Sequence, residues 1–178
     1  MGKLVVSDAN IFIDLIAMGF IGDFFQLPYD IMTVDFIMRE LKKSGQKEIV
    51  RAYETRKKLT IRTFSSDEID KINALRESAE YKVSVQDCSI WFCAKTSGAA
   101  ILTGDKALTV KARGDGIEVH GLLFILDKLV EQNIIPPSLA SEKLSELTSE
   151  NKRLPEKLVK EFIFRWGSLM IFDRESDY

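Results

Sequence analysis

The chain has 178 residues, which suits one well-filled core and is short for two large independent domains. Apolar residues make up 46% and charged residues 29%, a composition typical of folded globular proteins and not of disordered chains. The net charge of −2 excludes a broadly basic coat, so a polyanion would have to meet local positive patches or bound cations. The single histidine excludes a His-rich zinc site, so any catalytic chemistry is expected to depend on carboxylates.

The two cysteines, Cys88 and Cys93, are too few for a disulfide framework and indicate a reducing, cytoplasmic location. Buried small apolar side chains are a better interpretation of them than a redox pair. No run of about 20 apolar residues occurs, so we expect no membrane-spanning segment. The apolar run at the N-terminus is too short for a signal peptide and ends at an acid.

Short apolar runs alternate with segments of helical spacing over the first two thirds of the chain. The runs predict buried strands at Leu4–Ser7, Ile31–Val34, Leu59–Thr63, Ala100–Thr103 and Ile117–His120. Strand alternating with helix predicts a three-layer α/β/α domain around a central, mostly parallel sheet. The strands are continuously apolar, as expected where both faces of a sheet are covered.

After Gly121 the pattern predicts helices only. These are expected at Leu122–Gln132, from an N-cap at Ser138 to Leu147, and from Pro155, as first helical residue, to Trp166. We therefore expect an α/β domain over residues 1–121 and a helical C-terminal extension, residues 122–178, packed on the same domain.

Four acids are placed to meet at one edge of the predicted sheet. Asp8 directly follows the first strand, and Asp105 follows the fourth strand across one glycine. Glu40 is expected about one and a half turns into the helix after the second strand, and Asp87 in the first turn of a helix over Val85–Ser97. In an open α/β sheet, ligands bind at the carboxyl ends of the strands, so these four side chains can converge there.

Converging carboxylates repel one another, at a cost of about 4 kcal/mol for charges 4 Å apart at an effective dielectric constant of about 20. Such a cluster persists when protons or cations neutralise it. Mg²⁺ and Mn²⁺ prefer oxygen ligands, and they activate water for attack on phosphodiesters. The acids therefore suggest a site for one or two of these ions. Each acid also has a structural interpretation, because Asp8, Asp87 and Asp105 can cap helices and Glu40 can be a solvated residue.

These residues resemble the PIN domains, compact α/β nucleases common among toxin–antitoxin ribonucleases. The string Val5–Ile13 is similar to the family's first strand, with its metal-binding Asp at Asp8 and an Asn two residues later, Asn10. Glu40 and Asp87 are similar to the family's second and third acids. The stretch from Gly98 to Asp105 is similar to the closing strand and its Thr-x-Asp motif.

The resemblance covers roughly residues 3–121 and implies an Mg²⁺- or Mn²⁺-dependent endoribonuclease, of the toxin type, with RNA as substrate. It implies that the metal-binding and catalytic acids are Asp8, Glu40, Asp87 and Asp105, supported by Asn10 and Thr103. It also implies a small antitoxin protein as a possible partner. A homodimer is a further possibility, since twofold dimers are the commonest oligomers.

Four basic residues lie near these acids in the sequence and are candidates for contacts with the RNA backbone, or for a solvated helix surface: Arg39, Lys106, Lys111 and Arg113. A haloacid-dehalogenase-type Mg²⁺ phosphatase is a disfavoured alternative, because Asn10 stands where that class requires a second Asp. A catalytically silent module that binds RNA or protein is another alternative. Phe20, Phe24 and Phe25 could line an exposed groove for a partner segment, or belong to the core or a dimer interface.

Overall fold

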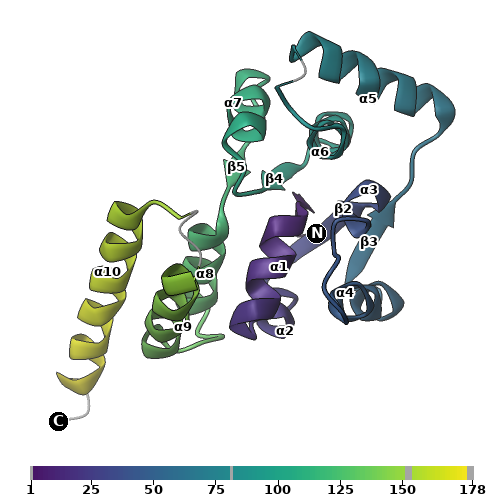
Figure 1. The fold of residues 1–178 in the computed structure, drawn as a ribbon. Coiled ribbons are helices and arrows are strands. Elements are labelled where there is room, and N and C mark those ends of the chain that lie inside the picture. The colour runs from purple at the N-terminus through teal and green to yellow at the C-terminus, as the bar shows by residue number, and fades with distance from the viewer. Residues whose placement is uncertain (1, 81, 151–153, 176–178) are drawn as a thin grey trace. The chain divides into compact units, whose positions relative to one another are not determined.

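The computed structural model describes residues 2–80, 82–150 and 154–175 and is shown in Figure 1. The chain divides into two compact units, which are treated separately below. Unit 1 comprises Met1–Ile13 and Pro28–Gly121, and unit 2 comprises Asp14–Leu27 and Leu122–Tyr178. One division therefore falls after Gly121. The other places the segment Asp14–Leu27 with the C-terminal helices, which the sequence did not predict.

Unit 1 is built on a five-stranded sheet in the order β3-β2-β1-β4-β5, with every neighbouring pair parallel. Its strands are β1 Lys3–Ser7, β2 Tyr29–Val34, β3 Leu59–Arg62, β4 Ala100–Leu102 and β5 Val119–His120. The central strands are buried on both faces, and Val6, Ile101 and Leu102 are fully inaccessible to solvent. The predicted α/β class and the parallel sheet are confirmed, with strand ends shifted by up to two residues.

Helices of unit 1 cover the sheet. They are the start of α1 Ala9–Met18, then α3 Asp35–Met38, α4 Gln46–Thr55, α5 Ser66–Ser78, α6 Val85–Ser97 and α7 Lys106–Gly114. Helix α6 packs on β1, β2 and β4, while α5 packs on α6 and α7 packs on α6 and β5. Helix α4 packs against β3, and in Figure 1 it lies on the other side of the sheet from α6. This is the expected result of right-handed crossovers that run in opposite directions from the centre of the sheet.

The chain reverses its direction across the sheet between β1 and β4. The connection from β1 leads to β2 on one side, whereas the chain returns to β4 on the other side. The two connections diverge at the carboxyl ends of these strands, a position that we call the crevice because open α/β sheets bind their ligands there. Ser7 pairs with Leu102, and the Asp8 amide continues the ladder by donating to the Leu102 carbonyl at 3.0 Å. The register therefore sets Asp8 beside Thr103 at the crevice.

Unit 2 is helical, as the sequence predicted for the C-terminal part. It contains α2 Ile21–Phe24, α8 Leu122–Glu131, α9 Pro137–Glu150 and α10 Glu156–Glu175, and α8 contacts α2, α9 and α10. The buried Trp166 indole donates to Asp127 Oδ1 at 3.1 Å and fixes α10 against α8. Two predicted helix starts were wrong, the first by two residues and the second by one. Helix α9 includes Pro137, and α10 begins after Pro155, whose carbonyl accepts the Val159 amide at 3.0 Å.

Of the two interpretations of Phe20, Phe24 and Phe25, the core is confirmed and the exposed groove is wrong, because all three rings are buried. Helix α2 carries Phe24 and contacts α8, and the Phe24 and Phe25 rings lie 5.3 Å apart. Cys88 and Cys93 are buried free thiols, which confirms their interpretation as small apolar residues. None of the helices in the described part of the chain is long and apolar enough to cross a membrane.

Candidate functional site

Asp8 is a buried carboxylate at the junction of β1 and α1, with only 3% of its surface exposed. Its Oδ1 atom accepts a hydrogen bond from the amide of Ala9, the first residue of α1, at 2.6 Å. Its Oδ2 atom accepts from Asn10 Nδ2 at 2.6 Å and from the Thr103 hydroxyl at 2.7 Å. Three donors therefore fix the orientation of this carboxylate.

Asn10 and Thr103, the two predicted supporting residues, connect the first and fourth strand ends. The Thr103 hydroxyl donates to Asp8 and accepts from the Asp105 amide at 3.0 Å. The Asn10 side chain donates to Asp8 and accepts from the Gly104 amide at 3.1 Å. Because each residue bridges two segments, the network sets the position of the Asp8 carboxylate relative to the loop that carries Asp105.

Asp105 and Asp87 stand at the beginnings of α7 and α6. Asp105 caps α7 by accepting the Leu108 amide at 2.7 Å on Oδ1. Ser84 caps α6 by accepting the Asp87 amide at 3.0 Å, and its hydroxyl donates to Asp87 Oδ2 at 2.6 Å. The capping roles considered from the sequence therefore exist. The contact of Ser84 with the Asp87 carboxylate was not predicted, although the Ser-x-x-Asp pattern was its signal.

The predicted position of Glu40 in a helix is wrong. Helix α3 ends at Met38, and Glu40 lies in the turn that follows, where its amide donates to the Ile37 carbonyl at 2.9 Å. The short helix reflects the sequence after it, since Lys42, Lys43, Ser44 and Gly45 form a polar stretch that ends in a left-handed glycine. Glu40 is half-buried beside the crevice and remains electrostatically coupled to the other acids.

The pKa values of Asp8, Glu40 and Asp87 are raised. The pKa of Asp8 rises to about 7, because burial and the charges of Asp87 and Glu40 outweigh the lowering effect of the Thr103 and Ala9 hydrogen bonds. Burial and the charge of Asp87 raise the pKa of Glu40. Burial raises the pKa of Asp87, the Ser84 hydrogen bonds lower it, and the charge of Asp105 raises it. These charge interactions link four acids from distant segments, which we call the cluster.

The cluster is open. Within residues 2–80, 82–150 and 154–175, no three Asp, Glu, His or Cys side chains stand close enough to enclose a metal ion. The donors present are carboxylate oxygens, which suit a hard cation and no soft one. Mg²⁺ usually keeps several water ligands and binds through one or two carboxylates, so an open arrangement fits this ion better than a closed cage. Asp14, another buried acid, lies in unit 2 and causes none of the pKa shifts of Asp8, Glu40 and Asp87.

The predicted basic residues are placed differently with respect to the acids. Lys106 is exposed in the first turn of α7, directly after Asp105, and Arg39 is exposed next to Glu40. Lys111 lies farther along α7. Arg113 lies in the last turn, about 12 Å of helix rise from Asp105, and donates to the Val119 carbonyl at 3.2 Å. Arg39 and Lys106 are therefore exposed beside an acid in the sequence, whereas Arg113 lies far along α7 from Asp105.

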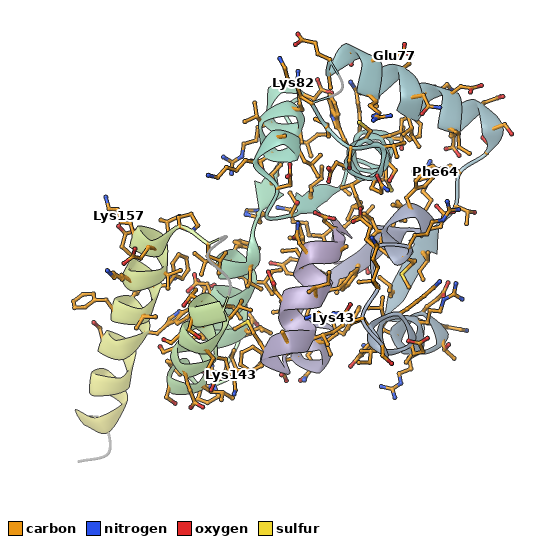
Figure 2. All side chains as sticks on the ribbon, viewed as in Figure 1. Lys43, Phe64, Glu77, Lys82, Lys143 and Lys157 are labelled. Atoms are coloured by element: carbon orange, nitrogen blue, oxygen red, sulfur yellow. The ribbon has the colours of Figure 1, made fainter. Side chains whose placement is uncertain are left out.

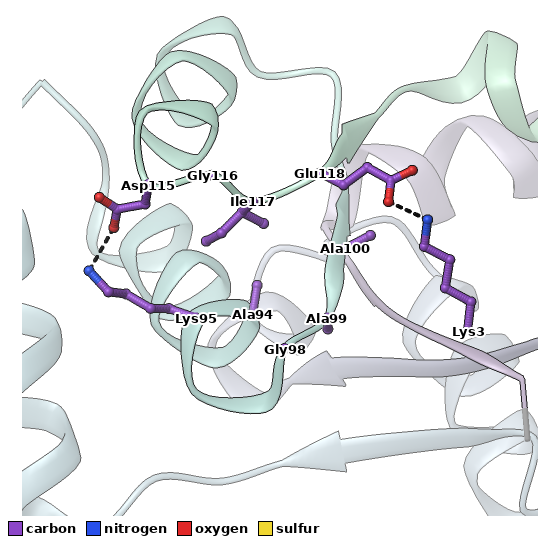
Figure 3. Close-up of a pocket in the computed structure, with 10 residues that line it drawn as sticks. All are labelled: Lys3, Ala94, Lys95, Gly98, Ala99, Ala100, Asp115, Gly116, Ile117 and Glu118. Carbon is purple, nitrogen blue, oxygen red and sulfur yellow. Dashed lines mark hydrogen bonds and ion pairs between the residues drawn. The ribbon is translucent and has the colours of Figure 1, made fainter.

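A hollow of about 330 Å³ lies at the opposite edge of the sheet, where β1 and β4 begin. Figure 3 shows that its floor consists of small residues around Ala94 and Ala99, between two ion pairs. These pairs join Lys3 to Glu118, and Lys95 to Asp115 at 2.7 Å. Because the four charges in its lining are already paired, this hollow offers a ligand less than the acidic crevice does.

Replacing Thr103 by valine should weaken Mn²⁺ binding by about 10- to 100-fold, as changes to residues that orient metal ligands commonly do. The isosteric valine keeps the buried volume but removes the hydrogen bond to Asp8 Oδ2 and the acceptor for the Asp105 amide. Isothermal titration calorimetry with Mn²⁺ measures the change. Thr109→Val is a control, because that hydroxyl caps only the Asp105 carbonyl within α7. Equal affinity of Thr103→Val and the wild type would contradict the supporting role.

Comparisons with known proteins agree with this architecture. A family model described as a PIN domain matches residues 4–168. Among solved structures, PAE2754 from Pyrobaculum aerophilum superposes with a TM-score of 0.53 at 14% identity, over 74% of this chain and 99% of that chain. VapBC2 from Rickettsia felis, solved bound to a DNA fragment from its promoter, gives a TM-score of 0.48 at 15% identity, over 67% and 98%. A search of curated proteins found no match.

The parallel sheet, the crevice at its reversal point and the coupled acids define an α/β domain with an acidic site at the carboxyl edge. The chain belongs to the PIN-domain family, because the family model matches most of its length. PIN domains are generally nucleases and generally use divalent metal ions. The match extends beyond residues 3–121, on which the resemblance rested, and includes most of the helical C-terminal part.

Proposed function

We propose that this protein is an endoribonuclease that depends on Mg²⁺ or Mn²⁺, with Asp8, Glu40, Asp87 and Asp105 as its metal-binding and catalytic acids. The observation that carries the proposal is the buried Asp8 carboxylate, which Asn10 and Thr103 hold at the carboxyl edge of the sheet. Its raised pKa, to which the charges of Asp87 and Glu40 contribute, supports the same conclusion. A carboxylate held in this way by Asn10 and Thr103 is stabilised in its ionised form when a cation is bound.

In the proposed hydrolysis of a phosphodiester, different residues of the chain have different roles. Asp8, Glu40, Asp87 and Asp105 would hold a divalent ion, which when bound would supply neutralisation of their charge, polarisation of the phosphate and activation of water. Asn10 and Thr103 orient the Asp8 carboxylate. Its remaining lone pairs are therefore held in a fixed position, in which they could bind the ion. Asp87 accepts the Ser84 hydroxyl on Oδ2, so its Oδ1 atom lies outside that bond. The proposed products carry 5′-phosphate and 3′-hydroxyl ends, because water attacks the phosphorus and the 3′-oxygen leaves.

Lys106 and Arg39 are proposed to contact the RNA backbone. Both are exposed and lie directly beside one of the acids in the sequence, and they supply the local positive charge that a chain with net charge −2 otherwise lacks. Toxin-type activity, a small antitoxin partner, a homodimer and a reducing, cytoplasmic location complete the proposal. They rest on the resemblance of this chain to toxin–antitoxin PIN domains, on the general frequency of dimers and on its two free thiols.

A catalytically silent binding module is the second candidate. The observations that favour it are the helix-capping bonds of Asp8 and Asp105, and the absence of a closed three-acid shell in the described residues. In this case the acids would stabilise helix starts without binding an ion. The haloacid-dehalogenase alternative loses its basis, because the chain is a PIN domain. In addition, the Asn10 side chain has a structural role in the first loop, since its nitrogen donates to Asp8 and its oxygen accepts the Gly104 amide.

Incubation of the purified protein with labelled single-stranded RNA, with and without Mn²⁺, tests the proposal. We expect cleavage only with the ion, and a loss of at least about 100-fold in Asp87→Asn, which removes a charge but keeps the side-chain volume. Asp115→Asn is the matched control, since Asp115 is also next to a helix end in unit 1 but binds Lys95 at the opposite sheet edge. Cleavage by Asp87→Asn at the wild-type rate would contradict the assignment, and ion-independent RNA binding without cleavage would support the silent module.

A further inference from the structure

Three phenylalanine rings form a continuous row in unit 1, which we name the aromatic ladder: Phe36 on α3, Phe64 between β3 and α5, and Phe92 on α6. The ring centroids of Phe36 and Phe64 lie 6.1 Å apart, and those of Phe64 and Phe92 lie 5.9 Å apart. Interplanar angles of 58° and 68° leave the rings inclined to one another and not stacked. Figure 2 labels Phe64 on the segment that joins β3 to α5.

The aromatic ladder adjoins the acids because the same two segments carry both. Phe36 lies in α3, and Glu40 lies in the turn directly after that helix. Helix α6 carries Asp87 in its first turn and Phe92 five residues later, a separation of about 7.5 Å along the helix axis. Helices α3 and α6 contact each other, and Glu40 and Asp87 are electrostatically coupled. Because α3 follows the end of β2 and Phe64 follows the end of the parallel strand β3, Phe36 and Phe64 lie at the same carboxyl edge of the sheet as the acids.

The aromatic ladder is half-open to solvent. Phe92 is buried at 7% exposure and forms its closed end, whereas Phe36 and Phe64 are half-buried. Rings that served packing alone would be expected to be covered throughout, as Phe12 and Phe24 are. Aromatic rings beside a cleavage site offer surfaces on which unpaired bases stack, whatever the base.

Two arginine side chains lie over these rings, and they differ in how many other side chains hold them. The Arg62 guanidinium lies 5.2 Å from the Phe64 centroid and is held by Glu68 at 2.5 Å and Thr96 at 2.9 Å, so it fixes the ring. The Arg39 guanidinium lies 5.4 Å from the Phe36 centroid and is exposed. No ion pair of Arg39 occurs among the described residues, so its charge is available to a phosphate.

We infer that the aromatic ladder binds single-stranded RNA: an unpaired base close to the scissile phosphate stacks on Phe36 and Phe64, and Arg39 contacts the backbone. The inference rests on the proposed nuclease function of the adjoining acids. It adds a base-binding subsite to that function, and this subsite requires an unpaired base, because a base within a duplex is stacked on its neighbours and its face is not available to a protein ring. Arg62 is a positioning residue that holds Phe64 and does not itself reach the RNA.

Abasic substitution of a single-stranded RNA, one nucleotide at a time around the cut, tests the stacking contact. Wild-type protein should lose about 5- to 100-fold in kcat/KM at one or two positions, mainly through KM, as expected for a stacked base. Phe64→Leu keeps an apolar side chain but removes the ring, so it should lose a similar factor on intact RNA and be insensitive to the abasic site. Phe64→Trp should restore the sensitivity.

Tyr53→Leu is the matched control, because Tyr53 also carries an arginine over its ring, Arg56 at 5.6 Å, but precedes β3 at the opposite sheet edge. It should leave both kcat/KM and the abasic profile unchanged. Binding is also measured by fluorescence anisotropy in an Asp87→Asn background, with and without Phe64→Leu, which separates stacking from cleavage. If wild-type protein cleaves RNA but shows a flat abasic profile, the inference fails and the nuclease stands. If it never cleaves, the proposed function fails, and unaltered binding by Phe64→Leu would overturn the inference as well.

Discussion

Replacing Asp8 by asparagine is expected to reduce Mn²⁺-dependent RNA cleavage by more than about 100-fold, a larger effect than loss of a residue that only orients a ligand. The same change should stabilise the metal-free protein. Ionising Asp8 at pH 8, with a folded pKa of about 7 against 3.8 in the unfolded chain, costs about 4 kcal/mol. Losing the bond from Ala9 or Asn10 costs about 1–3 kcal/mol, so a net gain of about 1–3 kcal/mol is expected.

Urea denaturation in EDTA at pH 8 measures this gain, and the cleavage assay measures the loss of activity on the same preparation. Asp23→Asn, at a half-buried acid of unit 2, is the control and should change neither result strongly. A destabilised Asp8→Asn protein with full activity would show that the carboxylate serves the fold and not the ion.

Lowering the pH from 8 to 6 is expected to stabilise the metal-free protein by about 1.4 kcal/mol through Asp8 alone. The sign follows from its raised pKa, because the folded protein binds a proton near pH 7 that the unfolded chain binds only near pH 4. Burial also raises the pKa values of Glu40 and Asp87, which act in the same direction. Acids with lowered pKa values, such as Glu118, lose their contribution only at more acidic pH.

Mn²⁺ should reverse this pH dependence, because the ion requires the deprotonated carboxylates and competes with protons for them. At 100 times the dissociation constant, the ion should add about 2.7 kcal/mol, or roughly 5–10 °C in Tm for a chain of this size. The stabilisation should be larger at pH 8 than at pH 6 and absent in Asp8→Asn. Differential scanning calorimetry at both pH values measures it, and an ion-independent Tm in the wild type would contradict metal binding at Asp8.

The sheet was predictable from the sequence because its strands are buried on both faces and are therefore short, continuous apolar runs. The helices after Gly121 were predictable for a similar reason, since α8 has a broad apolar face. Tertiary grouping was not predictable in the same way. The segment Asp14–Leu27 follows β1 in sequence but belongs to unit 2, and its phenylalanines complete a core whose other residues come from the end of the chain.

The placement of the site was also predictable in part. Asp8 and Asp105 follow strands directly, so the parallel sheet alone brings them to one edge. Glu40 was placed in a helix that ends two residues earlier, because the apolar spacing of Ile37 and Leu41 is satisfied by burial in a turn as well as in a helix. The aromatic ladder was not predicted, since its three rings come from separate segments, and only the fold shows that they meet.

Diffraction from crystals soaked in Mn²⁺, recorded at a wavelength where the ion scatters anomalously, tests most directly whether the acids form a metal site. Our account predicts one or two anomalous peaks within coordination distance of carboxylate oxygens from Asp8, Glu40, Asp87 and Asp105, and none there in crystals of Asp8→Asn. An empty crevice at saturating Mn²⁺, or ions bound only at other acids, would contradict it.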